Sequence, residues 1–341
     1  MVPPSHTSAP TISDVAKAVG VSRATVSRAF SRPQMLSEET VKRVRAAAAR
    51  LGYTPNLIAR ALSTGRQGNL AIVVPDIANP FFPPLIHAAQ ASADAAGFSV
   101  FLANSDEDAI REKVLVDRLA MQVEGFVLAS SRMSDKTIHE LALRLPVVLV
   151  NRDTSGLPRV LIDNADGIDA AVAHLAELRH RCVVYVGGPA ASWSDQQRRL
   201  AIQRASVRYK VRIKWVSAHH PTFDAGKEVT KEVLGLNATA AITFDDFVAH
   251  GLLSGLAEQG ITVPRDFSVI GCDDVLGAST HPALTSLSAR CDEAGRMAVD
   301  LLLSRLRTGK KSDVRCLLAT KLVVRATTGR SPQKTKPCSS N

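Results

Sequence analysis

Apolar runs and amphipathic segments alternate along most of the chain from residue 70 onward. Strand-like apolar runs lie at 70–74, 98–103, 125–129, 146–151, 182–188, 240–244 and 267–272. Between them, apolar residues recur at helical spacing, for example at 84–96, 110–121, 166–177, 196–209 and 247–259. Strands that are each followed by a helix are typical of parallel sheets covered on both faces. This part of the chain is therefore predicted to be α/β, with two doubly wound parallel-sheet lobes.

The first 65 residues follow a different pattern, that of short amphipathic helices. Thr11, Ser22 and Ser37 each stand where a helix N-cap is expected. Gly20 and Gly52 stand where a helix must end, because glycine readily takes the left-handed conformation. The pattern predicts an all-α head with helices at 12–19, 23–30 and 38–51, in which Val26 and Phe30 are inward positions of the second helix.

Length and composition narrow the class of protein. A chain of 341 residues has room for two or three domains. No stretch of about 18 consecutive apolar residues occurs, so no membrane-spanning helix is expected. The first ten residues lack a basic start and an apolar stretch, which favours a cytoplasmic protein. The five cysteines are scattered without a C-x-x-C pair, so we expect no disulfide framework and no zinc site. We also expect no bound metal or cofactor.

The positive charge is concentrated at the two ends. The net charge is +10, and residues 1–65 hold nine basic and three acidic residues, a net of +6. The last twelve residues hold three basic residues and no acidic one, which leaves the body near neutral. A small basic head indicates a polyanion-binding domain, most often one for nucleic acid. The alternative is a basic surface that serves solubility alone.

A short helix, a glycine turn and a polar helix are typical of a helix-turn-helix. In that motif the second helix enters the major groove of DNA with its N-terminal residues at the base edges. Arg23 and Arg28 can each donate two hydrogen bonds to a guanine, and Thr25 and Ser27 are short donors suited to phosphates. On pattern alone, a helical hairpin with a solvated charged face remains an alternative.

Sequence motifs in both the head and the body resemble those of a known protein family. The head consists of ISDVAKAVGVSRATVSRAFSRP followed by LSEETVKRVRAAAARLGYTPNLIARALSTGR. The body adds, in order, VVPDIANPFF, VNRD, VGGPAASWSDQQRR, AITFDDFVAHG, VPRDFSVIGCDD and PALTSL. The chain closely resembles the lactose/galactose repressor (LacI/GalR) family of bacterial transcription regulators, up to about residue 329. The resemblance implies a homodimer that binds a palindromic double-stranded DNA operator and a small sugar-like effector.

The same resemblance implies roles for individual residues of the head. It assigns base reading to Arg23, Ala24 and Arg28, and backbone contacts to Thr11, Ser22, Thr25 and Ser27. It also implies a hinge helix near residues 56–63 that orders on DNA, with contacts from Asn56, Ala59 and Leu62. Leu62 would wedge into the central base step, which costs a few kcal/mol of unstacking that added contacts offset. Its alternative is a linker leucine packed on the core.

Polar residues follow several of the strand-like runs. In open α/β sheets a ligand binds beyond the carboxyl ends of the strands, and carboxylates, Arg and aromatic faces suit a sugar. The resemblance implies effector contacts by Arg198, Asp245 and Asp273, and a cleft lined by Asn79, Phe81, Phe82, Asn151 and Trp193. Some of these positions have structural alternatives. Asn79 can form an Asx turn, Trp193 can belong to the core, and Asp246 and Asp274 can cap helices or tie loops.

The chain also departs from the family pattern. Asp245 stands where asparagine is common, which favours an effector with more hydrogen-bond donors or a positive charge. Residues 210–220 are unusually polar and match the pattern only loosely. The tail 330–341 has no leucine heptads, so we expect a dimer without a tetramer-forming helix.

Other functional classes explain less of the sequence. No G-x-S-x-G, G-x-G-x-x-G, Walker or H-E-x-x-H motif occurs, so no enzyme is expected. A solute-binding protein would have no use for the basic head. The sequence therefore predicts a sugar-responsive transcriptional repressor, and a regulator whose ligand strengthens DNA binding is the alternative. The predicted segments are a disordered N-terminus 1–10, a DNA-binding domain 11–55, a hinge 56–66, an effector and dimerisation domain 67–329 (lobes 67–163 with 291–318, and 164–290 with 319–329), and a disordered tail 330–341.

Overall fold

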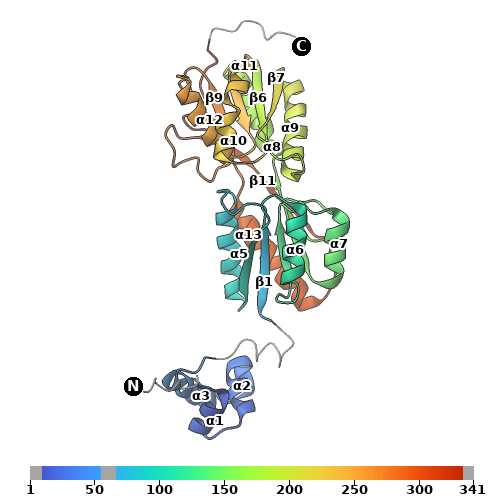
Figure 1. Ribbon diagram of the computed structural model, residues 1–341, viewed down its shortest axis with the longest axis vertical. Coiled ribbons are helices and arrows are strands. Elements are labelled where there is room, and N and C mark those ends of the chain that lie inside the picture. The colour runs from blue at the N-terminus through green and yellow to red at the C-terminus, as the bar shows by residue number, and fades with distance from the viewer. Residues whose placement is uncertain (1–9, 55–66, 333–341) are drawn as a thin grey trace, which may run out of the picture. The chain divides into compact units, whose positions relative to one another are not determined.

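The computed structural model describes residues 10–54 and 67–332 (Figure 1). The chain divides into two compact units, Met1–Gln67 and Gly68–Asn341. The predicted hinge contacts of Asn56, Ala59 and Leu62 lie outside the described residues, as does most of the predicted N-terminal segment and tail. No helix in the described part of the chain is long and apolar enough to cross a bilayer.

The head contains the three predicted helices, α1 (Ile12–Val19), α2 (Arg23–Ser31) and α3 (Glu38–Leu51). A 3-10 turn, Pro33–Met35, joins the last two. Ser22 and Ser37 cap their helices by accepting hydrogen bonds from the backbone of Thr25 and Thr40. Gly20 (φ 74°) and Gly52 (φ 69°) end α1 and α3 in the left-handed conformation, as predicted.

A small apolar core joins the three helices. Val15, Val26 and Val44 are fully buried, one from each helix. On α2, Ala29 is also fully buried, whereas the predicted inward residue Phe30 is half-buried and lies 6.1 Å from the ring of Tyr53. The alanine packs against the neighbouring helices because a small side chain allows closer approach, and the larger ring covers the edge of the core.

The body contains two six-stranded sheets, as the α/β pattern predicts (Figure 1). The first has the order β11-β5-β4-β3-β1-β2, with all strands parallel. The second has the order β12-β10-β9-β8-β6-β7 and differs from the prediction in one respect, because β12 pairs antiparallel with β10. The strands of the first sheet are β1 (Asn69–Val74), β2 (Ser99–Asn104), β3 (Phe126–Ala129), β4 (Val147–Val150), β5 (Arg159–Asp163) and β11 (Arg315–Ala319). Those of the second are β6 (Cys182–Gly187), β7 (Arg212–Ser217), β8 (Ala240–Thr243), β9 (Ser268–Asp273), β10 (Thr285–Ser288) and β12 (Lys321–Val323).

Helices cover both faces of each sheet, which gives four apolar cores. On the first sheet, α5 and α13 cover one face, and α6 and α7 the other. On the second, α8 and α9 lie opposite α10, α11 and α12. The helices span Phe82–Ala95 (α5), Ala109–Leu119 (α6), Asp135–Arg144 (α7), Ala165–Glu177 (α8), Trp193–Tyr209 (α9), Phe223–Glu228 (α10), Thr230–Gly235 (α11), Asp246–Glu258 (α12) and Cys291–Thr308 (α13).

Several elements were missing from the pattern-based prediction. Strand β7 lies in the polar stretch 210–220, and β10 is the polar sequence TSLS. β7 is an edge strand, so one side faces solvent and its apolar signal is weak. In β10, Thr285 and Ser286 are fully buried because Thr285 pairs with the backbone and hydroxyl groups of neighbouring segments and Ser286 donates to Asp246.

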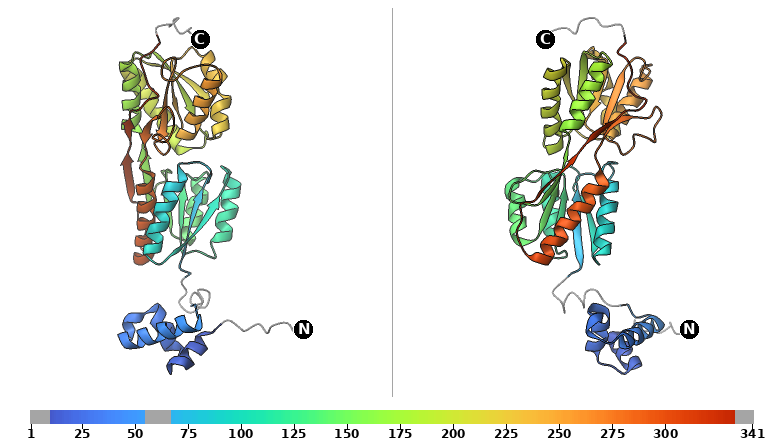
Figure 2. Two further views of the ribbon diagram at one scale, coloured as in Figure 1. Left: turned by 90° about the vertical axis from the view of Figure 1, so that its left-hand side faces the viewer. Right: turned by 180° about the vertical axis from the view of Figure 1, so that it is seen from behind.

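The chain crosses between the two sheets three times. The crossings join β5 to α8, β10 to α13 and β11 to β12. Figure 2 shows the last two, where the orange-to-red segment runs along one lobe through α13 and returns to the other through β11 and β12. The residues that follow the strands of both lobes line one pocket, so a single cleft lies at the carboxyl ends of two sheets.

Candidate functional site

The outer face of α2 carries the residues predicted to contact DNA. Arg23, Ala24, Ser27 and Arg28 are exposed, and Thr25 is half-buried. Ser22 and Thr25 are joined by a hydroxyl hydrogen bond of 2.9 Å at the start of the helix. Thr11 caps α1, and its hydroxyl donates to Asp14 at 2.7 Å. The head therefore presents two guanidinium groups and several short hydroxyls beside two helix N-termini, an arrangement that suits a polyanion.

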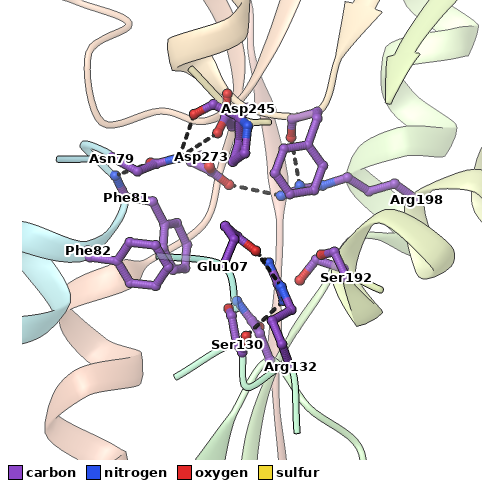
Figure 3. A pocket seen from close by; sticks show the side chains of 14 residues that line it. Asn79, Phe81, Phe82, Glu107, Ser130, Arg132, Ser192, Arg198, Asp245 and Asp273 are labelled. Atoms are coloured by element: carbon purple, nitrogen blue, oxygen red, sulfur yellow. Dashed lines mark hydrogen bonds and ion pairs between the residues drawn. The ribbon is translucent and has the colours of Figure 1, made fainter. Parts of the chain in front are cut away.

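The cleft between the lobes of the body has a volume of about 30 Å³. It is lined by Asn79, Phe81, Phe82, Glu107, Ser130, Arg132, Asn151, Ser192, Ser194, Arg198, Pro221, Phe244, Asp245 and Asp273 (Figure 3). Both lobes contribute to the lining, so a ligand here would contact both.

Arg198 and Asp273 form a buried ion pair on one wall of the cleft. Their closest atoms, Nη2 and Oδ1, lie 2.9 Å apart, and each side chain is 5% exposed. Nη1 donates to the carbonyl of Phe244 at 2.6 Å, and the guanidinium lies 4.9 Å from the centre of the Phe244 ring. The Nε–H of Arg198 is buried without a partner. A buried donor left unsatisfied costs about 1–3 kcal/mol, so a ligand oxygen placed here would recover that free energy.

A buried carboxylate shapes the loop that leads to Arg198. Asp195 accepts hydrogen bonds from the hydroxyl of Tyr185 and the backbone of Gly188, both at 2.9 Å. A side chain at Gly188 would meet the ring of Phe244, at 2.5 Å from an added Cβ. Ser192 caps α9 by accepting from the backbone of Asp195. These contacts place Ser192, Ser194 and Arg198 on the cleft side of the helix.

Asn79 joins the two lobes across the cleft. Its Nδ2 donates to Asp245 Oδ2 at 2.8 Å and to the carbonyl of Pro221 at 3.3 Å. Its Oδ1 accepts from the backbone of Phe81 at 3.0 Å, which is the Asx turn expected as an alternative. Asp245 in turn caps α12 through the backbone of Val248. One asparagine therefore both forms the turn and bridges the lobes.

Asp246 and Asp274 have the structural roles expected as their alternatives. Asp246 accepts hydrogen bonds from Ser286 and from the backbone of Val275 and Leu276, so it ties the loop after β9. Asp274 forms an ion pair with Arg325. Neither residue lines the cleft.

The other wall contains a second ion pair. Arg132 donates through Nε and Nη2 to the carboxylate of Glu107, at 2.5 and 3.1 Å, and through Nη1 to the carbonyl of Ser130. The side chains are 6% and 13% exposed. Glu112 is buried behind this loop and accepts from the backbone of Arg132 and Met133. Burial raises the pKa of Glu112 although these hydrogen bonds oppose it.

Three residues that line the cleft have positive φ angles. They are Ser130 (52°), Asn151 (52°) and Asp273 (100°), each at or directly after the end of a strand. Side chains other than glycine rarely adopt this conformation, and such strain clusters at functional sites. Each of these turns brings a polar residue to the cleft, which supports a binding role for this edge of the two sheets.

Burial changes the acidity of the carboxyl groups around Arg198. Burial and the charge of Asp273 raise the pKa of Asp245 to about 7 and that of Asp246 to about 8, from an ordinary value of 3.8. Burial also raises the pKa of Asp273, against the effect of Arg198. In each case the folded state holds its proton to a higher pH than the unfolded chain does. The stabilisation is therefore complete below about pH 4 and is lost as pH rises through the folded-state pKa values.

We expect the midpoint of thermal unfolding to fall by several degrees between about pH 5.5 and pH 8.5. The measurement is calorimetry across this range on the wild type and on Asp245→Asn/Asp246→Asn. The double variant has lost both titrating groups, so its midpoint should fall less. If the unfolding midpoints of the wild type and the double variant fall equally with pH, Asp245 and Asp246 are not the groups that titrate in this range.

Of the eight residues predicted to contact an effector, seven line the cleft. They are Asn79, Phe81, Phe82, Asn151, Arg198, Asp245 and Asp273. Trp193 does not, and is half-buried at the start of α9. Ser194 and Arg198 are four residues apart and share the cleft face of the helix, whereas Trp193 is rotated away by about 100°. Its predicted contact therefore finds no support in the geometry of the pocket.

Seven residues that line the cleft were not among the predicted effector contacts: Glu107, Ser130, Arg132, Ser192, Ser194, Pro221 and Phe244. Glu107 and Arg132 follow the apolar runs at 98–103 and 125–129, so the strand-end rule could have found them. Phe244 was counted as part of an apolar run and not as the residue that follows the strand. Among residues 10–54 and 67–332, no group of three or more His, Cys, Asp or Glu side chains is arranged to hold a metal ion.

Comparisons with known proteins agree with this architecture. Residues 11–56 match the family model "Bacterial regulatory proteins, lacI family", and residues 172–328 match "Periplasmic binding protein-like domain". The chain is 31% identical over 333 residues to the HTH-type transcriptional repressor CytR of Escherichia coli (strain K12), which covers 95% of this chain and 98% of the relative.

Two solved structures are also similar. The Lac repressor dimer bound to operator and the anti-inducer ONPF superposes with a TM-score of 0.83 at 26% identity, over 94% of this chain and 99% of that one. A LacI family regulator from Enterococcus faecium with bound ribose gives a TM-score of 0.70 at 26% identity, over 77% and 99%. With its helix-turn-helix head, its two α/β lobes and a relative matched along nearly its whole length, this chain belongs to the LacI family of bacterial regulatory proteins.

Proposed function

We propose that this protein is a cytoplasmic repressor of carbohydrate-utilisation genes that a small sugar-like effector releases from a palindromic operator. The observation that carries the proposal is the buried Nε–H of Arg198, which lacks a partner in a polar cleft on the same chain as a DNA-binding head. A hydroxyl oxygen of a sugar would satisfy this donor. The proposal includes no catalytic role.

The DNA half of the proposal rests on the head. Arg23 and Arg28 are exposed on α2 and carry the forked donors that suit the O6 and N7 atoms of guanine. Ala24 can contact at most a thymine methyl group. We propose that Thr11, Ser22, Thr25 and Ser27 contact phosphates. A homodimer with two such heads would bind two inverted half-sites, because the two-fold symmetry of the protein requires a matching symmetry of the operator. The similar Lac repressor binds its operator as a dimer.

The effector half rests on contacts between the lobes. The hydrogen bond from Asn79 to Asp245 and the pair Arg198–Asp273 lie around the same cleft, so a ligand there would favour the closed arrangement of the lobes. A change in that arrangement would alter how the two heads of a dimer are presented to DNA. Such coupling between sites is typically worth 1–3 kcal/mol, or 5–150-fold in DNA affinity.

The test is a selection of bound duplexes from a random DNA pool by the full-length protein, near physiological salt because DNA affinity depends on salt. We expect a palindrome with a short central step. Candidate sugars are then added to the selected duplex, and release is expected. If a sugar instead strengthens DNA binding, the ligand acts as a corepressor and not as an inducer. No enrichment with or without sugars would contradict the proposal.

A further inference from the structure

The charges in the cleft are arranged as two internally compensated pairs. Arg198 is paired with Asp273 on one lobe, and Arg132 with Glu107 on the other (Figure 3). Arg132 uses Nε and Nη2 on Glu107 and Nη1 on a carbonyl, so each of its nitrogens already has an acceptor. Of the three side-chain nitrogens of Arg198, Nε is the one without an acceptor.

A fifth charged group in the lining has no cation of its own. Asp245 accepts from Asn79 and from the backbone of Val248, and neither donor is charged. The described lining residues therefore contain three carboxyl groups and two guanidinium groups. Asp246 adds another carboxyl group behind this wall. His219 and His220, next to the lining residue Pro221, are exposed at the rim.

Two helix N-termini at the cleft, those of α9 and α12, are capped by side chains. Helix N-termini bind phosphate through free backbone N–H groups. In α9 the side chain of Ser192 accepts from the backbone of Asp195, and in α12 the carboxylate of Asp245 accepts from that of Val248. In the second case a carboxylate already stands where a phosphate would bind.

We propose that the effector is an uncharged, hydroxyl-rich molecule, such as a free sugar or a glycoside, and that Glu107 and Asp245 exclude phosphorylated sugars. This inference rests on the proposed function and names the ligand class of its cleft. The phenylalanines Phe81, Phe82 and Phe244 offer apolar faces to the C–H groups of a sugar ring. Hydroxyls can donate to the carboxylates and accept from Arg198 Nε. A phosphate would meet like charges at short range with no uncompensated cation.

The experiment compares neutral sugars with their phosphate esters on the full-length protein at pH 7.5. Calorimetric titrations use D-ribose against D-ribose 5-phosphate and D-glucose against D-glucose 6-phosphate. We expect at least one neutral sugar to bind, and its ester to bind at least ~100-fold more weakly, since like charges at short range repel strongly in a partly buried site. An ester that binds as well as its parent would overturn the inference and leave the sugar-responsive function standing. If no neutral sugar and no ester binds, both this inference and the proposed sugar-responsive function are overturned.

A charge variant tests the cause of the discrimination. Glu107→Gln removes the negative charge that compensates Arg132, so the affinity ratio between sugar and ester should fall by ~10-fold or more. The matched control is Glu258→Gln, which breaks an exposed pair with Lys227 outside the cleft. The control should keep the wild-type ratio. An unchanged ratio in Glu107→Gln would show that this carboxylate does not exclude phosphate.

Discussion

Asp273→Asn should abolish the response of the protein to its effector and leave operator binding intact. Asp273 holds Arg198 at 2.9 Å, and both side chains lie in the cleft. Asparagine has nearly the same shape and tolerates the positive φ of 100° better than alanine does. The change removes a buried charge that the guanidinium needs, and losing one member of a buried pair is strongly unfavourable. We expect effector affinity to fall ~30-fold or more, because hydrogen bonds to charged groups are worth about 1.5–3 kcal/mol.

The measurement is effector titration of the operator complex by fluorescence anisotropy. Asp274→Asn is the matched control, because the neighbouring aspartate also has a positive φ but pairs with Arg325 and does not line the cleft. The control should respond like the wild type. A further variant, Arg198→Ala, removes the other member of the pair. If Asp273→Asn and Arg198→Ala both respond normally, the cleft is not the effector site.

Arg28→Ala should flatten the base preference of the protein at one position of each half-site. The guanidinium is exposed on α2, and a bidentate contact to guanine is worth about 1–3 kcal/mol of discrimination. The preference at that position should therefore fall ~10–100-fold, while other positions keep theirs. By contrast, Ser27→Ala should weaken binding to all sequences alike, because a phosphate contact carries no sequence information.

The measurement is a repeat of the duplex selection with each variant. Arg45→Ala is the control for charge, since it removes one exposed cation from α3 and not from α2. It should lower affinity without changing the selected sequence. An unchanged preference in Arg28→Ala would mean that this arginine does not read a base.

Local sequence patterns were sufficient to predict the helices of the head. Cap residues, glycine stops and helical spacing act over a few residues, so they predicted α1 and α3 to the residue and α2 to within one. The central apolar strands of the body were also found, because their runs are buried on both faces; these are β1, β3, β4, β6, β8 and β9. Edge strand β7 and the polar strand β10 were missed because solvent and tertiary hydrogen bonds, respectively, replace the apolar signal there.

The residues that line the cleft could be predicted from the sequence only in part. The strand-end rule, together with family resemblance, identified Arg198, Asp245 and Asp273 as candidates, and all three line the pocket. The resemblance also placed Trp193 in the cleft, but helix rotation turns this side chain away from the lining. The alternatives proposed for Asp246 and Asp274 describe their observed contacts.

The sequence by itself determined the three helices of the head, the α/β class of the body, the order of head and body, and the family to which the chain belongs. Only the tertiary structure decided how charges pair in the cleft. Arg132 meets Glu107 from another strand end 25 residues away, and Asn79 meets Asp245 across 166 residues. No local rule can specify these contacts, because they depend on how two sheets and three crossings bring distant strand ends together. The charge that the cleft offers to a ligand is therefore a property of the fold.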